Sequence, residues 1–381
     1  MIIPIVYAPM ERDGYFFTNK FQSEFEKAVV EKKHLYLEIP GNNYQSFDYD
    51  TLFQKRPRLV IVMATQRHWL IPALHFFQEK KIGVLLLGEN PSPEIPVRGS
   101  LTTDFDSQLS TLLKHLEDCG CTKTALYNVF ENSVPDCEKR RFFVKHLSQK
   151  GFSDPHQYCI TNVSGLKQCY RDFYSRINEF DSVICTNSLA AISLIKQLNH
   201  DGVRVPEDIQ VATFGTLHIS KFFKTSVTSV IPTQIDFPYK SVVQLYRFLY
   251  TTPENDALQI KITMTGKLKI NETTRLLSSH LTTPIESNHV TNLEHLDFHD
   301  DEEVRAFMGL EQLFTICEEL DIKLLHYALK GYSYERMAEK LHTSTSTVFY
   351  RLQRMIQASN FDSRASLENY LRSHNFEDMF F

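Results

Sequence analysis

The stretch Asp181-Ser-Val-Ile-Cys-Thr-Asn187 is followed, after residues 188–200, by Gly202-Val-Arg-Val-Pro-Glu-Asp-Ile-Gln-Val-Ala-Thr-Phe214. Each stretch contains a short run of aliphatic and β-branched residues, which is typical of a buried strand. The residues between them have the length and apolar spacing of an amphipathic helix. Two such strands joined by a helix indicate a βαβ unit, in which the strands are parallel and helices cover the sheet.

The same alternation of strands and helices extends over the first 270 residues. Strands are predicted at 2–7, 35–39, 59–64, 83–88, 124–129, 158–161, 182–186, 209–214 and 228–231, and helices near 16–33, 66–81, 104–118, 136–150, 165–178, 188–200 and 234–250. One sheet of so many strands would be large, and the proline-rich residues 89–96 interrupt the pattern. We therefore expect an α/β fold with two smaller doubly wound sheets, and a ligand site in a cleft at the carboxyl ends of their strands.

The composition limits the class of protein. The chain has 381 residues, 42% of them hydrophobic, which is enough for two or three domains. It contains no run of eighteen apolar residues, and Met1–Tyr7 resembles a first strand more than a secretory signal. We therefore expect a cytoplasmic protein without membrane contact.

The cysteines and the known catalytic motifs give no sign of enzyme chemistry. The seven cysteines have no framework spacing, and Cys119-Gly-Cys121 is their only close pair, so we expect reduced, mostly buried thiols. We find no HExxH, paired CxxC, glycine-rich phosphate loop or G-x-S-x-G. The sequence therefore predicts no metal, no cofactor and no enzyme activity.

The last quarter of the chain has a different character. Residues 276–302 are polar and aperiodic, which predicts a linker, and residues 303–319 have the apolar spacing of a connecting helix. Residues 320–381 read as a helical domain with helices at 321–330, 333–341, 345–358 and 364–373. The net charge of −5 argues against nucleic-acid binding, but Leu320–Phe376 carries eight Lys/Arg against five Asp/Glu.

Residues 1–275 resemble the effector-binding domains of LacI/GalR regulators. The resemblance rests on 181–187 and 202–214, on Thr228-Ser-Val230, on the closing segment Gly266–Thr274 and on the aromatic turn Gly14–Phe17. It implies a two-lobed type I periplasmic-binding-protein-like sensor whose chain crosses between lobes near 100–120, 215–235 and 250–260. A small molecule, such as a sugar or a nucleobase, would close the lobes around itself.

By position, the resemblance implies effector contacts from the loops that follow the strands. These residues are Glu11, Asp13, Tyr15, Phe16, Gln66, Glu89, Asn187 and Thr216. Alternatively, Phe16 belongs to the core and Asn187 caps the helix that starts at Ser188. Thr213-Phe-Gly-Thr216 replaces the usual Gly-Phe-Asp-Asp, Glu89-Asn90 replaces Asp-Arg, and no arginine has a clean match near Lys139–Arg141. The pocket would therefore take an unusual ligand or none.

The segment Ala328–Leu341 with Ser344–Val348 resembles the LuxR/NarL helix-turn-helix. Its matching residues are Gly331, Ser333, Ala338, Leu341, Ser344, Thr347 and Val348. The resemblance implies that the helix at 345–358 reads double-stranded DNA. The expected contacts are Arg336, Lys340, Ser344, Thr345, Ser346, Phe349, Tyr350, Arg351, Gln353 and Arg354.

Chemistry suggests a task for several of these side chains. Gln353 and Arg354 suit adenine and guanine edges, Phe349 suits a thymine methyl group, and Arg336, Lys340 and Arg351 suit phosphates. The alternative is a solvated polar face on a small helical bundle. On the last helix, Leu367, Tyr370 and Leu371 would form either core or a dimer contact.

Together these features predict a homodimeric one-component transcription regulator whose sensor responds to a sugar-like molecule. A second hypothesis keeps DNA binding but assigns the sensor fold only to dimerisation or protein contacts, without a small ligand. A third, a solute-binding component of a transporter, would need export and leaves the C-terminal helices without a role.

Overall fold

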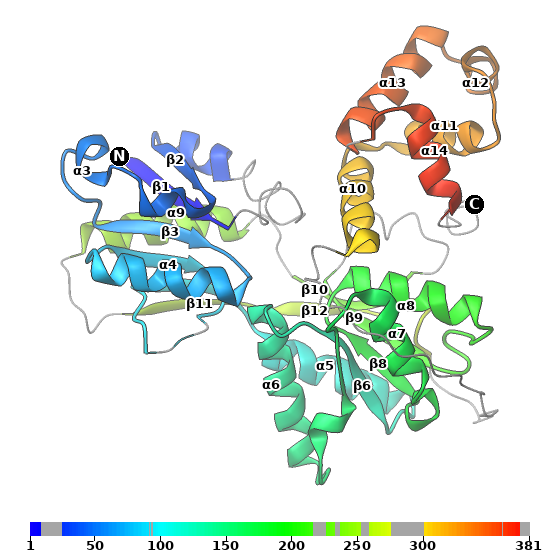
Figure 1. The fold of residues 1–381 in the computed structure, drawn as a ribbon, viewed down its shortest axis with the longest axis horizontal. Coiled ribbons are helices and arrows are strands. Elements are labelled where there is room, and N and C mark those ends of the chain that lie inside the picture. Colours follow the sequence, from blue (N-terminus) through cyan, green and yellow to red (C-terminus); the bar gives the residue numbers. More distant parts are fainter. Residues whose placement is uncertain are drawn as a thin grey trace.

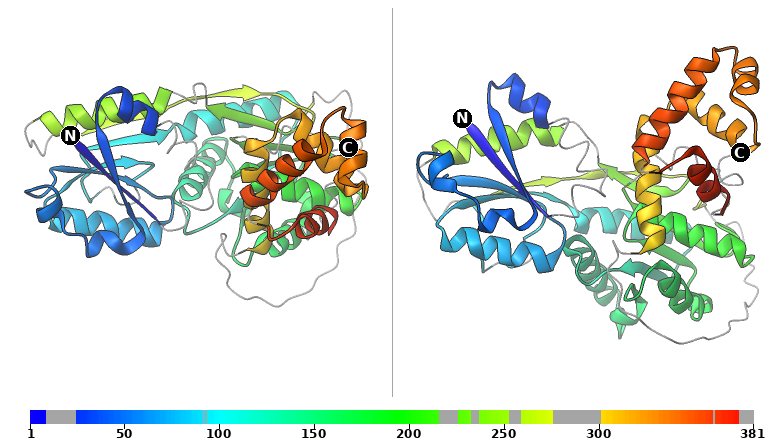
Figure 2. Two further views of the ribbon diagram at one scale, coloured as in Figure 1. Left: turned by 90° about the horizontal axis from the view of Figure 1, so that it is seen from above. Right: turned by 45° about the horizontal axis from the view of Figure 1, so that its top comes forward.

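The computed structural model describes residues 1–8, 25–90, 92, 94–215, 226–232, 237–252, 259–275, 301–359 and 361–373. Its first part consists of two six-stranded sheets, each with helices on both faces, which we call lobe 1 and lobe 2 (Figure 1). A group of C-terminal helices lies beside lobe 2 and away from lobe 1 in all three views (Figures 1 and 2). The predicted two-lobed α/β fold with a helical C-terminal region is confirmed.

Lobe 1 is a fully parallel sheet with the order β11-β5-β4-β3-β1-β2. Its strands are β1 (Ile2–Tyr7), β2 (Leu35–Pro40), β3 (Leu59–Met63), β4 (Gly83–Leu87), β5 (Gly99–Thr103) and β11 (Ile260–Met264). Its helices include one that covers 25–31, the short α3 (Tyr49–Leu52), α4 (Arg67–Glu79) and α9 (Phe237–Thr251).

Lobe 2 has the order β12-β10-β9-β8-β6-β7, and only the β10–β12 pair is antiparallel. Its strands are β6 (Thr124–Val129), β7 (Cys159–Thr161), β8 (Ser182–Cys185), β9 (Gln210–Phe214), β10 (Thr228–Pro232) and β12 (Gly266–Lys269). Its helices are α5 (Phe105–Asp118), α6 (Val134–Gln149), α7 (Leu166–Tyr174) and α8 (Ser188–His200). Short 3-10 turns lie at Gly41–Gln45 in lobe 1 and at Pro155–Tyr158 and Ile177–Glu179 in lobe 2.

The chain crosses between the lobes after β5, after β10 and between β11 and β12. The first two crossings agree with the predicted ranges. The third prediction, at 250–260, was wrong, because β11 still belongs to lobe 1 and the chain passes to lobe 2 at Thr265. The strands β5 and β11 were absent from the sequence prediction.

Successive side chains of each strand pack into two different cores, one on each face of the sheet. In β1, Ile3 and Ile5 join the cluster under α9, while Val6 joins the cluster under α4. In β6, Tyr127 faces α7 and α8, while Leu126 faces α5 and α6. The period-two pattern of a sheet buried on both faces explains why these strands are apolar throughout.

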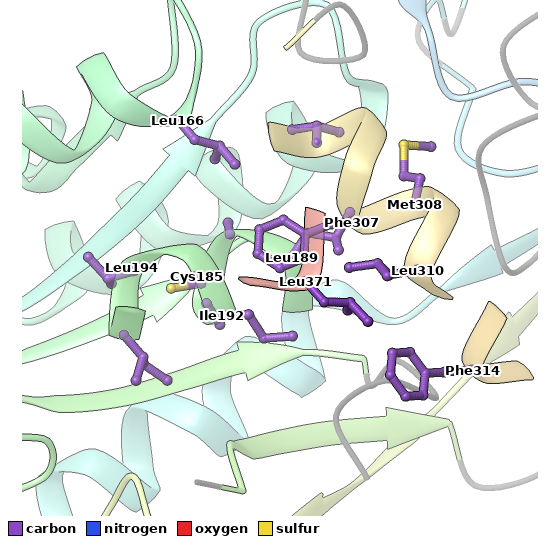
Figure 3. Close-up of a cluster of buried hydrophobic side chains, with 14 of the residues drawn as sticks. Leu166, Cys185, Leu189, Ile192, Leu194, Phe307, Met308, Leu310, Phe314 and Leu371 are labelled. Carbon is purple, nitrogen blue, oxygen red and sulfur yellow. The ribbon is translucent and has the colours of Figure 1, made fainter. Parts of the chain in front are cut away.

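The C-terminal helices are α10 (Glu302–Ile316), α11 (Glu319–Leu329), α12 (Tyr334–Lys340), α13 (Thr345–Ala358) and α14 (Arg364–Ser373). Their buried side chains belong to the same cluster as those of α7 and α8, which we call the shared cluster. Figure 3 shows Phe307 and Leu310 of α10 and Leu371 of α14 beside Leu189 and Ile192 of α8. The helix predicted over 303–319 is therefore packed onto lobe 2 along its apolar face.

Candidate effector site and candidate DNA-binding face

The lobes touch where loops leave the carboxyl ends of β3 and β6. The Val134 N–H donates to the Thr65 carbonyl oxygen at 2.8 Å, and the Arg67 N–H donates to the Asn132 carbonyl oxygen at 2.7 Å. The Val134 side chain is buried in the lobe 1 cluster under α4. Residues 65–68 and 132–134, which we call the seam, thus hold the lobes together directly.

Two of the predicted effector residues of lobe 1 lie at this junction. Gln66 is 4% exposed, and its Nε2 has no hydrogen-bond partner among the residues that the structure describes. Glu89 follows β4, and its carboxylate lies 3.2 Å from Lys261 Nζ. Burial raises the pKa of Glu89, while the nearby Lys261 ammonium opposes the shift. Both side chains are therefore polar groups held in low-dielectric surroundings beside the other lobe.

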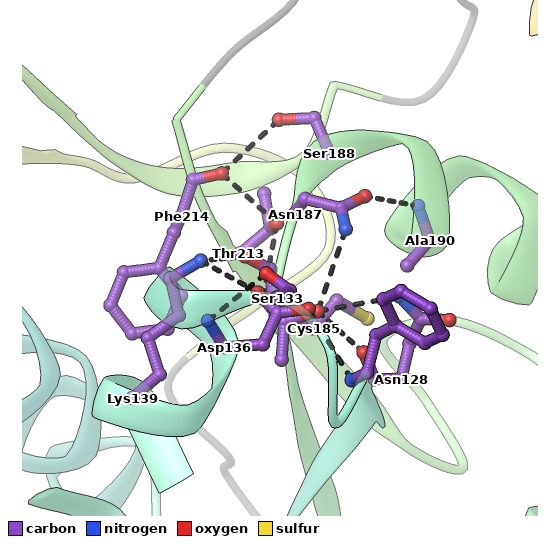
Figure 4. Close-up of polar contacts among 12 residues, drawn as sticks. Asn128, Ser133, Asp136, Lys139, Cys185, Asn187, Ser188, Ala190, Thr213 and Phe214 are labelled. Atoms are coloured by element: carbon purple, nitrogen blue, oxygen red, sulfur yellow. Dashed lines mark hydrogen bonds and ion pairs between the residues drawn. The ribbon is translucent and has the colours of Figure 1, made fainter. Parts of the chain in front are cut away.

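Lys139 is a buried basic residue on the lobe 2 side of the junction (Figure 4). It is 6% exposed, and its Nζ donates to Asp136 Oδ1 at 3.1 Å and to the Thr186 carbonyl oxygen at 2.7 Å. The ammonium also lies 4.9 Å from the Phe105 ring centre and 5.2 Å from that of Phe214. The sequence reading missed this residue; the available signal was an i,i+3 Asp–Lys pair in the first helix after β6.

Asn187 takes the capping role that was left open. Its Oδ1 accepts from the Ala190 N–H at 2.9 Å at the start of α8, and its Nδ2 donates to Thr186 Oγ1 at 3.5 Å. The other predicted effector residues (Glu11, Asp13, Tyr15, Phe16 and Thr216) lie outside the described residues.

A series of hydrogen-bonded, buried polar groups begins at Thr186, whose carbonyl oxygen accepts from Lys139. Thr186 Oγ1 donates to the Asn128 carbonyl oxygen at 2.7 Å, and Asn162 Nδ2 donates to Asn128 Oδ1 at 2.8 Å. Asn162 Oδ1 in turn accepts from the Gly165 N–H at 2.8 Å. Asn128 has φ +67° and is fully buried, a conformation that asparagine tolerates better than most residues.

This series of hydrogen bonds ends at Asp301, at the start of the connecting helix α10. The Leu166 N–H donates to Asp301 Oδ2 at 2.7 Å, and Asp301 Oδ1 accepts from the Glu303 N–H at 2.8 Å. One carboxylate therefore caps both α7 of lobe 2 and α10. Gly165 has φ +94°, and a Cβ there would collide with this carboxylate, so the position requires glycine.

The C-terminal helices form a capped two-helix turn. Ser333 Oγ accepts from the Arg336 N–H at 3.3 Å at the start of α12, and Ser344 Oγ accepts from the Thr347 N–H at 3.1 Å at the start of α13. Between them His342 adopts φ +51°. Ser333 and Ser344 therefore cap their helices, and the buried stripe of α13 consists of Val348, Leu352, Met355 and Ile356.

The outward face of α13 carries aromatic and hydroxyl side chains. Thr345, Ser346, Phe349 and Tyr350 are exposed, Phe349 by 51% and Tyr350 by 69%. Arg336 and Lys340 of α12 are exposed as well, and Gln353 is half-buried. The outward face of α13 thus combines two exposed aromatic side chains with hydroxyl groups, beside the basic residues of α12.

Two predicted DNA contacts are engaged inside the protein instead. The guanidinium groups of Arg351 and Arg354 both donate to the carboxylate of Asp321, at 3.0 and 2.8 Å. Leu367 and Leu371 of α14 are 2% exposed and belong to the shared cluster, so they are core residues.

The remaining predictions concern thiols, metals and membranes. All seven cysteines are free, and burial raises the pKa of Cys121 to about 12. Among the described residues, no group of three or more His, Cys, Asp or Glu side chains could hold a metal ion. In the same part of the chain, no helix is both long and apolar enough to cross a membrane.

Comparison with known proteins supports the sensor resemblance. Residues 113–273 match the sequence model of the periplasmic binding protein-like domain. The chain is 23% identical over 192 residues to the HTH-type transcriptional regulator GalR of Streptococcus thermophilus, which covers 41% of this chain and 58% of that protein. It is 25% identical over 127 residues to the arabinose metabolism transcriptional repressor of Halalkalibacterium halodurans, covering 32% and 33%. The chain therefore spans less than two thirds of either relative.

The solved structures agree on the architecture. The LacI family regulator CCPA of Weissella paramesenteroides, solved with bound glucose, superposes with a TM-score of 0.56 at 18% identity and covers 73% of this chain and 100% of its own. The two lobes thus form a type I periplasmic-binding-protein-like domain of the kind found in LacI/GalR regulators, and the helices α10–α14 are docked on its second lobe.

Proposed function

We propose that this chain is a DNA-binding transcription regulator whose two-lobed sensor controls a C-terminal helix-turn-helix of LuxR/NarL type. The observation that carries the proposal is the shared cluster, which joins an effector-type lobe directly to a capped helix with an exposed aromatic and polar face. A helix of this kind fits the major groove of B-DNA.

The proposed DNA contacts are side chains of α12 and α13 together with the N-cap Ser344. Ser346, Phe349, Tyr350 and Gln353 face base edges, with Ser344 and Thr345 at the helix N-terminus beside a phosphate. Arg336 and Lys340 bind phosphates. A homodimer would present two copies of α13 to two half-sites related by the same symmetry.

The proposed effector is a sugar-like molecule bound at the lobe junction. Support comes from the glucose bound to the related CCPA and from the chemistry of this site. The unpartnered Nε2 of Gln66, the Asp136–Lys139 pair and the Asn187 side chain suit hydroxyl groups, and the Phe214 ring lies beside the Lys139 ammonium as an apolar neighbour. Glu11, Asp13, Tyr15, Phe16, Glu89 and Thr216 complete the proposed set.

The test of DNA binding starts from a random library of duplexes selected on the full-length chain. The double variant Phe349→Ala, Tyr350→Ala is expected to weaken binding to the selected duplex about tenfold or more, the value of good base contacts. Phe248→Ala in α9 is the matched control, because Phe248 is equally exposed (50%) but lies in lobe 1. Failure to enrich any duplex would contradict the proposal.

A second candidate function keeps DNA binding and omits the small ligand. The seam favours it, because backbone hydrogen bonds between residues 65–68 and 132–134 join the lobes directly. Thermal unfolding with a panel of monosaccharides, disaccharides and nucleosides distinguishes the two, since a ligand that binds the native state raises the melting temperature. A rise that Lys139→Met abolishes supports the sensor, whereas no rise across the panel supports the second candidate.

A further inference from the structure

Asp321 is a fully buried carboxylate at the start of α11. Its side chain is 0% exposed, and it accepts hydrogen bonds from Arg351 Nη1 at 3.0 Å, from Arg354 Nη2 at 2.8 Å and from the Glu318 N–H at 2.9 Å. Both arginines belong to α13, where their i,i+3 spacing places them on neighbouring turns. One carboxylate thus joins two successive turns of the helix that we assign to DNA recognition.

The same arginines also reach the neighbouring elements. Arg354 Nη2 donates to the carbonyl oxygen of Ile316, the last residue of α10, at 3.1 Å. Arg351 Nη2 donates to Glu318 Oε2 at 3.0 Å. The middle of α13 is therefore bonded both to the start of α11 and to the end of the connecting helix.

We propose that Asp321 is the positioning residue for DNA recognition, a role that rests on the proposed function. The apolar stripe of α13 gives a non-directional attraction, which tolerates small rotations of the helix about its axis. Two charge-assisted hydrogen bonds to one immobile carboxylate do not tolerate them. The carboxylate therefore fixes which side chains of α13 are presented to solvent, among them the exposed Phe349 and Tyr350.

DNA readout depends on this orientation. Base-edge contacts require the reading side chains within a fraction of an ångström and about 10–20° of their working geometry. Phosphate contacts from flexible, exposed side chains such as Lys340 depend on it less. Loss of the Asp321 charge should therefore reduce sequence discrimination more than general affinity for DNA.

The experiment compares Asp321→Asn with the wild type in the full-length chain. Asparagine keeps the size of the side chain and removes the charge that holds both arginines. Dissociation constants are measured at one salt concentration for the selected duplex and for an arbitrary duplex of the same length. The expected result is about a tenfold or greater loss for the selected duplex and less than about threefold for the other.

Glu368→Gln is the matched control. Glu368 forms ion pairs with Arg364 and Arg372 within α14, its side chain is 14% exposed, and none of the three lies on α13. This variant also loses ion pairs of the C-terminal helices, but its ratio of specific to general affinity should stay at the wild-type value.

Two further measurements keep the outcome decisive. Amide hydrogen exchange without DNA should speed up in α13 more than in α14 of Asp321→Asn. If that variant does not fold, Arg354→Lys, which keeps the charge but loses the planar fork, should show a smaller drop of the affinity ratio. An unchanged ratio in a folded variant overturns the positioning role, whereas a wild type that selects no duplex overturns the proposed function itself.

Discussion

Lobe 1 and lobe 2 have the same architecture but differ in what covers one face of their sheets. In lobe 1, the helix at 25–31 with α9 covers one face and α4 the other, and among the described residues Val134 is the one side chain of lobe 2 in their two clusters. In lobe 2, α5 and α6 cover one face, while the cluster under α7 and α8 continues into α10–α14. The second lobe thus shares a continuous core with the proposed DNA-binding helices.

This difference assigns different roles to the lobes. Because interiors are close-packed and transmit displacement, the C-terminal helices should follow lobe 2 as one body. Within the described residues, the hydrogen bonds between lobe 1 and that body lie in the crossing segments and the seam. A ligand that changes the angle between the lobes would therefore change where α13 lies relative to lobe 1.

The largest expected effect comes from removing a large side chain of the shared cluster. Phe307 is 0% exposed, and Phe307→Ala should cost about 3–5 kcal/mol, the usual value for such a truncation. Amide exchange should accelerate in both α8 and α13. Phe77→Ala in α4, equally buried in lobe 1, should cost a similar amount but accelerate exchange in lobe 1 alone. If amide hydrogen exchange in α8 is unchanged in the Phe307 variant, lobe 2 and the helices α10–α14 do not share one core.

The double cap at Asp301 should have the next largest effect. Asp301→Ala removes the acceptor for the N-termini of both α7 and α10, and should cost about 1–3 kcal/mol. Asp104→Ala is the control, because Asp104 caps α5 alone and accepts only from the Ser107 N–H at 3.0 Å. Denaturant unfolding gives both values. Equal losses for the two variants would show that Asp301 does not couple α10 to lobe 2.

The shared cluster also shows which features of the fold could be predicted from the sequence. The periodicity of α10 and α13 revealed their apolar stripes, and the caps Ser333 and Ser344 follow from local rules. Sequence periodicity does not say which surface a stripe packs on. The strands β5 and β11 were missed because Gly99-Ser-Leu-Thr-Thr103 is polar although largely buried, and Ile260-Lys-Ile-Thr-Met264 is a half-exposed edge strand.

The site residues also fall into those that the sequence predicted and those whose roles depend on contacts formed by folding. Gln66, Glu89 and Asn187 follow strand ends, and the resemblance to LacI/GalR sensors implied effector contacts at these positions. The role of Lys139, and the inward orientation of Arg351 and Arg354, depend on carboxylates and carbonyl groups brought close by folding. The partner of both arginines, Asp321, lies 30 residues away from Arg351 in the sequence. No local pattern identifies such a pair.

A smaller effect is expected at the seam. Val134→Ala shortens the one side chain of α6 that is buried in lobe 1, and should cost about 1–2 kcal/mol. Its backbone bond to Thr65 remains, so the fold should persist while the lobes separate more readily. Small-angle scattering should show an increased radius of gyration. The variant Val129→Ala, buried within lobe 2, should leave that radius unchanged, and an equal increase in both would contradict the role of the seam.

The smallest expected effect concerns Glu303, at the contact between α10 and α8. It is 8% exposed, accepts from Ser193 Oγ at 3.2 Å and lies 3.9 Å from Lys196 Nζ. Burial raises the pKa of Glu303 above 4.5, an effect that Lys196 opposes and Asp301 reinforces. A raised carboxyl pKa favours the folded state below pH 4.5, and this contribution is lost as the pH rises through the folded-state pKa.

Glu303→Gln should therefore raise the melting temperature at neutral pH by roughly 1–2 °C. The difference from the wild type should vanish below about pH 4, where the carboxyl group is protonated in both folded and unfolded chains. The neighbouring Glu302 is exposed at the N-terminus of α10, so Glu302→Gln should lower the melting temperature slightly through the helix dipole. If the melting temperature changes in the same direction in both variants, α10 is not buried against lobe 2 in solution. Lobe 2 would then resemble lobe 1 in having a core of its own.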